Sequence, residues 1–589
     1  MHNEAPWKPK HQEAAIREVG HWIDAEADGA VALNSEELTR YSARSPVCGW
    51  RVPFTFDFGA RNLDLLILPE FPRKAPRVAV VEVGEDPNLT PHVEEDGVLC
   101  LLDDMASVAD DDPLGAVQNV LASAYDLLAQ YLEGGGDEEL RREFVTYWSR
   151  GKTTGAAPVH SLLDECSESR SISVWRGRGI LLAANNEEEA ERWLRHRFPD
   201  LDEELIFDSG VLLHLNQALV PSQFPRNGQQ VLSLCDSQQD RRLIEQIANT
   251  SPPELFIIVG CSVEAGLCLA CVSLARPLRS EKGFRPATKW RKFFASGGAP
   301  TRRTVRRVDG PWIHGRGRDA RFPQLSGART VVIGCGSVGA PAAMALADAG
   351  VGSMTLIDPQ DLVSANVGRH PLGIDSIGEN KAVALKHKLL TKLPHMRDVT
   401  AHGVGWQDAL SANPDLFSAA DLILSATGIW AEEGALNEWH IASNRKTPVV
   451  YGWTEAHAVA GHAVVIKDSG GCLRCGTSAV GVKQLRVSEW PEGSEQLATE
   501  PGCGGLFQPY GPVELMGTIG LVAELALDEL LDGGSRTSST RRIWAAREAR
   551  TRELGGSWTD AWMRIVGSDE PGSLTRELPW SATPTCPDC

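Results

Sequence analysis

The sequence lacks the features that mark membrane-spanning and secreted proteins. No run of residues approaches the roughly 18 apolar residues that a membrane-spanning helix needs, and the apolar stretch 255–274 is interrupted by Gly, Glu and Cys. The first residues, MHNEAPWKPKHQEAA, carry charges and proline where a signal peptide needs an apolar core. We therefore expect a cytoplasmic protein without a membrane partner.

Basic residues are scarce relative to acidic ones. The chain has 58 Lys and Arg against 78 Asp and Glu, which gives a formal net charge of −20. Binding to a phosphate backbone requires clustered Lys and Arg, so nucleic acid is not expected as the main partner. The length of 589 residues and a hydrophobic fraction of 42% are ordinary for a globular protein with roughly three or four domains.

The 13 cysteines are an odd number, which does not suit a framework of disulfide bonds in a reducing compartment. CLAC at 268–271 lies in an apolar run that resembles a strand, so we expect these two cysteines to be core residues rather than metal ligands. Two further CxxC pairs are Cys472 with Cys475 and Cys586 with Cys589. Four thiolates are a typical ligand set of a structural Zn²⁺ site, and we expect these pairs to bind one ion.

Three regions follow one another along the chain. Residues 1–155 combine an expected helix at 11–27, alternating strands at 54–68 and a helix at 114–132. Residues 156–325 contain strand-like segments and a charged helix at 187–198, and the Arg-rich stretch 276–321 is expected to be a basic linker. Residues 326–589 alternate strands and helices, which predicts a parallel α/β sheet.

A nucleotide-binding motif opens the third region. The apolar strand 330–333 precedes GCGSVG at 334–339, and a helix and the strand 353–357 lead to Asp358. Glycines Gly334, Gly336 and Gly339 would let the backbone approach a phosphate at the helix N-terminus, and an acid about 20 residues further on suits a ribose hydroxyl. The motif alone fits NAD as readily as ATP.

The residues after Asp358 favour ATP. Asp361, Asn366, Arg369 and Lys381 follow within 23 residues of it. A hydride-transfer enzyme has no need for this Arg and Lys, whereas attack on the α-phosphate of ATP builds charge that fixed cations stabilise. We therefore interpret Arg369 and Lys381 as catalytic cations and Asn366 as a polar positioning residue.

The order G-x-G-x-x-G, D-x-x-D, N-x-x-R and G-x-x-K over residues 326–480 resembles the adenylation domain of ubiquitin-activating enzymes and their ThiF-type relatives of thiamine and molybdopterin synthesis. The resemblance implies that ATP, with Mg²⁺, activates the C-terminal carboxylate of a protein as an acyl-adenylate. Asp358 would bind the ribose, and Lys381 and Arg369 the phosphates. The similar enzymes also join two distant CxxC pairs.

The resemblance has further implications for assembly and metal binding. It implies a homodimer in which an arginine before the glycine loop crosses the interface, for which Arg316, Arg318 and Arg321 are candidates. Gly428 stands where the family commonly has an Asp for magnesium. Asp361, or the acids at 432–433, would then have to replace that ligand.

Two cysteines are candidate nucleophiles. Cys503 lies among glycines in ATEPGCGGLFQPYG at 498–511, which indicates an accessible loop. In activating enzymes of the ubiquitin class, a cysteine beyond the nucleotide fold attacks the adenylate and forms a thioester, because a thiolate is nucleophilic near neutral pH. A structural loop cysteine is the alternative interpretation.

Cys100 lies in GVLCL at 97–101, which resembles the catalytic segment of ubiquitin-conjugating enzymes. Thr90-Pro91-His92 replaces the family's His-Pro-Asn, so His92 stands in place of the asparagine that stabilises the oxyanion. A histidine can donate that hydrogen bond or act as a base, although a structural loop role is also open. Asp103 and Asp104 are candidates to orient an incoming amine.

With both resemblances in one chain, the sequence is similar to the fused conjugating–activating proteins of bacterial anti-phage (CBASS) operons. Those proteins conjugate a cGAS-like nucleotidyltransferase. The implied fold is multidomain, α/β and α+β: a ubiquitin-conjugating-like α+β domain at 1–155, an α/β middle linker domain at 156–325, and a Rossmann-like adenylation domain with structural zinc at 326–589. The acyl group would pass from the adenylate to Cys503, then to Cys100, and then to a target amine.

Other functions remain open at this point. The chain could conjugate a ubiquitin-like protein from a bacterial ubiquitin-like operon, or it could be a sulfur-carrier adenylyltransferase that stops at the adenylate. The departures at Gly428 and His92 would also suit a non-catalytic scaffold. A plain NAD dehydrogenase is disfavoured by Arg369 and Lys381.

Overall fold

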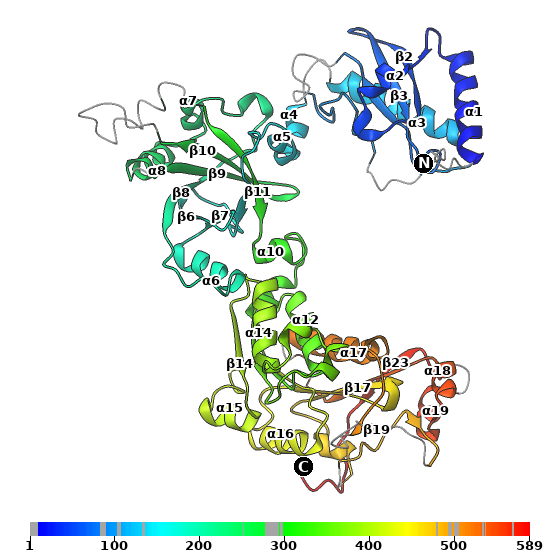
Figure 1. Ribbon diagram of the computed structural model, residues 1–589, viewed down its shortest axis with the longest axis vertical. Helices are drawn as coiled ribbons and strands as arrows, with labels where there is room; N and C mark the ends of the chain where they lie inside the picture. The colour runs from blue at the N-terminus through cyan, green and yellow to red at the C-terminus, as the bar shows by residue number, and fades with distance from the viewer. Residues whose placement is uncertain are drawn as a thin grey trace. The chain divides into compact units, whose positions relative to one another are not determined.

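The computed structural model describes residues 10–82, 90–102, 108–131, 136–250, 252–276, 294, 299–478, 481–492, 497–499, 506–532, 535, 537–567 and 571–589. These residues form two compact units (Figure 1). One unit comprises 1–160, 165–183 and 207–306, and the other 161–164, 184–206 and 307–589. The candidate residues Cys503, Asp103 and Asp104 lie outside the described residues.

The first unit begins with an α+β fold. A sheet in the order β1 (Val31–Ala32), β2 (Cys48–Phe56), β3 (Gly59–Ile67), β4 (Arg77–Val80) shares a core with helices α1 (Lys10–Glu26) and α3 (Pro113–Tyr131). Alternate residues of β3 face this core, as the period of two in a strand requires. Helix α2 (Ser35–Thr39) begins at Asn34, whose side chain accepts two backbone hydrogen bonds. The expected helix–strand–helix order is confirmed.

The rest of the first unit is built around a closed barrel. Its strand order is β10-β11-β5-β7-β6-β8-β9, with bounds β5 (Val159–Ser161), β6 (Arg170–Gly177), β7 (Ile180–Ala184), β8 (Phe207–His214), β9 (Glu254–Val263), β10 (Gly266–Ala275) and β11 (Thr301–Arg307). Helices α4 (Asp137–Arg142), α5 (Phe144–Arg150), α7 (Gly228–Leu232) and α8 (Gln238–Asn249) accompany it. Three large side chains of α5 lie in the barrel core: Phe144, Tyr147 and Trp148.

Strand β11 corrects one expectation. The Arg-rich stretch 276–321 was expected to be a linker, yet β11 pairs with β10 from Ser273 opposite Thr301 to Ala270 opposite Thr304. Its Arg303 is only 11% exposed and forms an ion pair with Glu254 at 2.8 Å. An arginine paired with a partly buried carboxylate is compatible with a barrel wall. The sequence alone does not reveal such a pairing.

The second unit contains a mixed sheet of order β14-β13-β12-β15-β16-β17-β21-β23. Strands β14 (Asp398–His402), β13 (Ser353–Ile357), β12 (Arg329–Ile333), β15 (Leu422–Ser425) and β16 (Val449–Thr454) run parallel. Strands β17 (Ala460–Ile466), β21 (Thr540–Ala545) and β23 (Leu574–Pro579) are antiparallel additions. The expected parallel sheet is therefore right for its first five strands and wrong for the last three.

Helices cover both faces of this sheet. One face packs on α12 (Gly339–Asp348), α14 (Lys381–Lys392) and α17 (Pro512–Asp532). The other packs on α15 (Trp406–Ala412) and α16 (Trp430–Ala442). Neighbouring residues of β12 alternate between the two cores: Val332 faces the first, and Val331 and Ile333 face the second. The glycine loop after β12 is thereby held at the carboxyl end of the parallel strands, where ligands bind in this class of sheet.

The remaining elements of the second unit are short or peripheral. They are α6 (Glu187–Arg197), α10 (Gly310–Ile313), α11 (Phe322–Gly327), α13 (Ser364–Val367), β18 (Ser488–Glu489), β19 (Ala498–Thr499), β20 (Leu506–Phe507), α18 (Glu548–Glu553), β22 (Ser557–Trp558) and α19 (Asp560–Val566). Within the described ranges, no helix combines the length and apolarity needed to cross a bilayer.

Candidate functional site

The glycine loop has the geometry that its sequence predicts. Gly334 has a φ of +87°, which glycine adopts without strain. A Cβ at Gly339 would lie 1.9 Å from the carbonyl oxygen of Gly334, so this position needs a glycine for close packing. A Cβ at Gly336 would meet nothing within 4 Å. The backbone at 336 is therefore open to a ligand, and the helix α12 begins directly behind it.

Two side chains fix the loop from opposite sides. The buried Asp358 accepts hydrogen bonds from the Cys335 N–H at 2.7 Å and from the Gln360 N–H at 2.8 Å. Nε2 of His370 lies 2.7 Å from the Cys335 carbonyl oxygen, to which it donates. Burial lowers the pKa of His370, which keeps the ring neutral with one N–H to give. Sequence reasoning identified Asp358 but missed His370, which belongs to no motif.

Lys381 lies at the start of α14 and is only 6% exposed. Its Nζ donates to Oε1 of Gln360 at 2.8 Å. The preceding Asn380 caps the helix through its Oδ1 and donates from Nδ2 to the Asp358 carbonyl oxygen at 2.9 Å. A buried ammonium group, the helix N-terminus and Asp358 are thus tied together beside the glycine loop, which is an arrangement suited to anions.

Arg369 connects this region to the segment that follows Cys503. Its Nη1 donates to the Gln508 carbonyl oxygen at 3.3 Å, and its guanidinium group lies 5.0 Å from the ring centre of Tyr510. Sequence reasoning did not identify Tyr510, although it is only seven residues from Cys503.

The acids considered for magnesium differ in their surroundings. Asp361 is exposed and pairs with Asn380 through an isolated β-bridge. Glu432 accepts a hydrogen bond from Gln407, and the buried Glu433 forms an ion pair with Lys483 at 2.9 Å. Both glutamates therefore have protein partners, which leaves Asp361 as the better candidate of the three.

The other residues predicted for the nucleotide site or the dimer make few contacts in the described structure. Asn366 lies in α13, where its Oδ1 accepts from the Val363 N–H at 3.4 Å. Gly428 has a φ of +64° and open space around it. Of the three arginines considered for a dimer, all are exposed, and Arg321 forms an ion pair with Asp319 at 2.8 Å.

The two distant CxxC pairs meet in space. The sulfur atoms of Cys472, Cys475, Cys586 and Cys589 all lie within 4.8 Å of one another. Individual Sγ separations are 3.7 Å between Cys472 and Cys586 and 3.2 Å between Cys475 and Cys589. Tetrahedral zinc with Zn–S bonds near 2.3 Å requires roughly 3.8 Å between sulfurs, so the donor set fits that ion. Cys268 and Cys271 belong to no such cluster within the described residues.

Neighbouring groups hold the cysteine cluster in place. The Thr583 N–H donates to Sγ of Cys475 at 3.4 Å, and Trp580 Nε1 donates to the Cys472 carbonyl oxygen at 2.8 Å. Asn437 of α16 accepts from the Leu473 N–H at 2.8 Å. Such contacts orient the cysteine side chains and attach residues 580–589 to turn and helix residues that pack on the sheet, as contacts around a metal site typically do.

Cys100 is exposed at the end of a buried segment. Val98 and Leu99 are fully buried, and the Leu99 N–H donates to the Val78 carbonyl oxygen of β4 at 2.8 Å. The Cys100 N–H donates to the carbonyl oxygen of His92 at 2.8 Å. Cys100 therefore lies at the surface, directly after a segment whose backbone is held by hydrogen bonds.

The side chain of His92 lies between two carboxylates. Its Nε2 is 3.5 Å from Glu139 and its Nδ1 is 3.6 Å from Glu143. The residue has a φ of +60°, in the left-handed region, which costs a non-glycine residue roughly 1–2 kcal/mol. In this arrangement the imidazole is directed at α4 and α5, and its main chain contacts Cys100.

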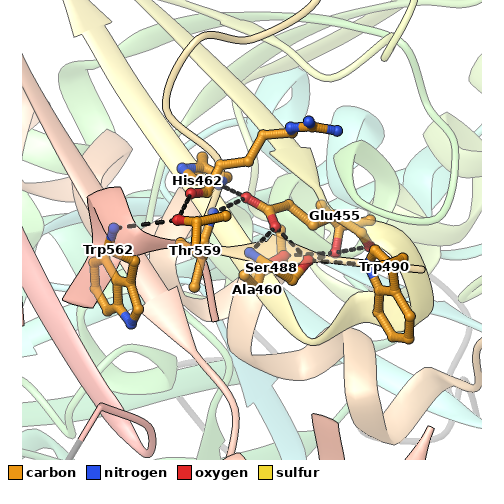
Figure 2. A network of polar contacts seen from close by, with 11 residues as sticks. Glu455, Ala460, His462, Ser488, Trp490, Thr559 and Trp562 are labelled. Carbon is orange, nitrogen blue, oxygen red and sulfur yellow. Dashed lines mark hydrogen bonds and ion pairs between the residues drawn. The ribbon is translucent and has the colours of Figure 1, made fainter. Parts of the chain in front are cut away.

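A buried polar network anchors the chain segment that leads towards Cys503 (Figure 2). Glu455 accepts hydrogen bonds from the Ser488 N–H and hydroxyl at 2.8 and 2.6 Å and from His462 Nε2 at 2.7 Å. Burial favours the neutral acid, but the hydrogen bond from His462 holds the pKa of Glu455 below its ordinary value. Trp490 Nε1 also donates to the Ser488 hydroxyl. Residues 487 and 488 are thereby bonded to Glu455, which lies between β16 and β17.

Comparisons with known proteins match two separate regions of the chain. Residues 317–542 match the ThiF family, and residues 25–156 match prokaryotic E2 family B. The ATP-dependent ubiquitin transferase-like protein Cap2 of Pseudomonas aeruginosa is 24% identical over 81% of this chain and 86% of its own length.

Two further relatives match only the C-terminal part. The probable adenylyltransferase/sulfurtransferase MoeZ of Mycobacterium tuberculosis is 31% identical over 39% of this chain and 57% of its own length. The sulfur carrier protein ThiS adenylyltransferase of Escherichia coli is 27% identical over 39% of this chain and 83% of its own length. One chain thus contains a region similar to prokaryotic E2 family B and a region similar to the ThiF family.

Proposed function

We propose that this chain uses ATP to activate the C-terminal carboxylate of a protein and passes the acyl group through Cys503 and Cys100 to an amine. The single observation that supports this best is the contact of Arg369 with Gln508 and Tyr510. It joins a cation of the nucleotide region to the segment that follows Cys503, as a direct transfer from an adenylate to this cysteine requires.

The first step is adenylation. The substrate carboxylate oxygen attacks the α-phosphorus of ATP, a new O–P bond forms, and the bond to the leaving pyrophosphate breaks. Lys381 and Arg369 stabilise the charge that develops on the phosphoryl oxygens. The helix N-terminus behind Gly336 and the carboxylate of Asp358 orient the nucleotide. Asp361 contributes to binding Mg²⁺, since this ion commonly uses one or two carboxylates together with phosphate oxygens.

Two thioester transfers and an aminolysis follow. The Cys503 sulfur attacks the acyl carbon, a C–S bond forms, AMP leaves, and the thiol proton passes to solvent. Cys100 then takes the acyl group by exchange of one C–S bond for another. An amine nitrogen, such as that of a lysine, attacks the thioester carbon, and the Cys100 thiolate leaves. Both cysteines belong to one chain, which raises their effective concentration for the hand-off.

The partner and assembly are part of the same proposal. The activated protein is a cGAS-like nucleotidyltransferase in an anti-phage operon, as the resemblance to fused conjugating–activating proteins implies; a ubiquitin-like protein is the alternative. The chain acts in the cytoplasm as a homodimer, with Arg316, Arg318 or Arg321 reaching the partner's nucleotide. The four clustered cysteines hold a structural Zn²⁺ ion, which their sulfur separations fit.

The test is co-expression of this chain with each protein encoded in its operon, followed by non-reducing gels. Wild type should form a reducible adduct with one partner. Cys100→Ala should move the adduct to Cys503, and Cys503→Ala should abolish it. Cys235→Ala is the control, because Cys235 lies in neither candidate segment. ATP–pyrophosphate exchange without any thioester would reject conjugation and leave a sulfur-carrier type of adenylyltransferase.

A further inference from the structure

Helix α5 holds the loop before Cys100 by its main chain. The His92 N–H donates to the Tyr147 hydroxyl oxygen at 2.9 Å. One residue further on, the Val93 carbonyl oxygen accepts from Nη1 of Arg150 at 2.8 Å. The guanidinium group of Arg150 also lies 4.7 Å from the ring centre of Tyr147. One turn of helix therefore grips two successive residues of this loop.

The opposite side of the same loop is bonded to Cys100. The His92 carbonyl oxygen accepts from the Cys100 N–H at 2.8 Å, and Val93 forms an antiparallel bridge with Leu99. A continuous chain of hydrogen bonds thus runs from Tyr147 through the backbone of His92 to the backbone of Cys100. Movement of α5 relative to the loop would therefore displace the backbone of Cys100.

The conformation of the loop at Pro91 and His92 is restricted by its neighbours. His92 keeps a φ of +60°, a strained conformation that persists only where the surroundings fix it, and such strain is concentrated at functional sites. A Cβ at Gly136, the residue before α4, would lie 2.3 Å from Cγ of Pro91. Glu139 and Glu143 enclose the imidazole ring.

The helix that grips the loop belongs to another core. Tyr147 is 1% exposed and packs with Phe144 and Trp148 among the barrel residues. Burial raises the pKa of Tyr147 to about 12, so its hydroxyl group stays neutral at physiological pH. Trp148 Nε1 donates to the Arg303 carbonyl oxygen of β11 at 2.9 Å. Helix α5 is therefore held against the barrel by packing and by this hydrogen bond.

We propose that Tyr147 and Arg150 are positioning residues for acyl transfer at Cys100, an inference that rests on the proposed function. They fix the His92 carbonyl group and with it the backbone of Cys100. In the transfer, an amine nitrogen bonds to the thioester carbon, the C–S bond breaks, sulfur leaves as the Cys100 thiolate, and the amine proton passes to solvent. A displaced cysteine lowers the rate of this step without changing how the amine is bound.

The first measurement is hydrogen exchange of the full chain, which needs no partner. Tyr147→Phe removes the acceptor for His92, and Arg150→Met removes the donor to Val93. Both should speed exchange in peptides covering 90–102, and Arg150→Lys should restore most of the protection. Tyr125→Phe and Ser149→Ala are matched controls. Tyr125 stacks on Phe56, and Ser149 bonds within α5.

The second measurement is single-turnover discharge of the Cys100 thioester to free L-lysine, with the operon partner that charges wild type. Tyr147→Phe and Arg150→Met should lower the maximal rate roughly tenfold or more. The half-saturating lysine concentration and ATP–pyrophosphate exchange should stay within twofold of wild type. Arg150→Lys should restore most of the discharge rate that Arg150→Met loses.

The outcomes separate the two proposals. If no partner charges wild-type Cys100, the proposed function fails, and the positioning role of Tyr147 and Arg150 in transfer fails with it. If wild type is charged but the variants discharge at its rate, the proposed function stands and the positioning role is wrong. Slow discharge without faster exchange at 90–102, or slow discharge of the Tyr125 and Ser149 controls, would also overturn the positioning role.

Discussion

Lys381 is tied to Gln360 by both its side chain and its main chain. Its Nζ donates to Oε1 of Gln360 at 2.8 Å, and its backbone N–H donates to the Gln360 carbonyl oxygen at 3.0 Å. Gln360 in turn donates its N–H to Asp358. Asp358 and Lys381, two of the charged residues predicted for the nucleotide site, are therefore both bonded to Gln360, which fixes a buried ammonium group relative to the glycine loop.

Replacement of Lys381 should abolish adenylation with little effect on folding. Lys381→Met is expected to lower ATP–pyrophosphate exchange about 100-fold or more, the loss typical when one donor to a developing charge is removed. Gln360→Ala should cause a smaller loss, because the ammonium group remains but loses its fixed position. Lys388→Met, an exposed change on the same helix, is the control. Full exchange activity of Lys381→Met would refute the role of this cation.

The cysteine cluster should hold one zinc ion. Elemental analysis of chain purified under reducing conditions should find about one Zn²⁺ per chain. Cys472→Ser or Cys586→Ser should lose the metal and lower Tm, because the ion joins segments about 110 residues apart. Cys48→Ser is the control: Cys48 lies far from this cluster in the sequence, and this variant should retain the metal. Metal-free wild type with the same Tm as the two variants would contradict the prediction.

One buried and one partly buried histidine, His440 and His395, should make stability fall in mild acid. Burial lowers the pKa of His395 to about 4, and burial also lowers the pKa of His440 to about 4. His314 donates through Nδ1 to the Asp348 carbonyl oxygen, so His395 Nε2 donates to His314 Nε2 at 2.7 Å in a neutral pair.

The sign of the effect follows from proton uptake. Below pH ~6.5 the histidines of the unfolded chain bind a proton, whereas those of the folded chain do not. Protonation therefore favours the unfolded state, and the free energy of unfolding decreases as the pH falls from about 6.5 towards 4. Between about pH 7.5 and pH 5 the loss should approach 2 kcal/mol per histidine. Melting curves should show a smaller fall of Tm for His395→Gln than for wild type. His387→Gln, an exposed change, should behave as wild type; equal falls for all three proteins would reject the assignment.

Much of the fold was predictable because its signals are local. Helices α1, α3 and α6 lie within one residue of their expected bounds, as the period of apolar residues within one element suffices to define them. The order and orientation of the added strands β17, β21 and β23 were not predictable, because strand pairing depends on segments far apart in the chain. Strand β11 was missed since its arginines look solvated until Glu254 is placed beside Arg303.

The same distinction applies to the candidate site. The sequence by itself identified as candidates the glycine loop, Asp358, Arg369, Lys381, the two CxxC pairs and the segment around Cys100, because each is a short pattern that can be read from neighbouring residues or from a family resemblance. Only the tertiary structure revealed Gln360, His370 and Tyr147 as partners of these residues and brought Cys472 to within 3.7 Å of Cys586. Such contacts have no local signal, since they arise when packed cores fix distant backbones at hydrogen-bonding distance.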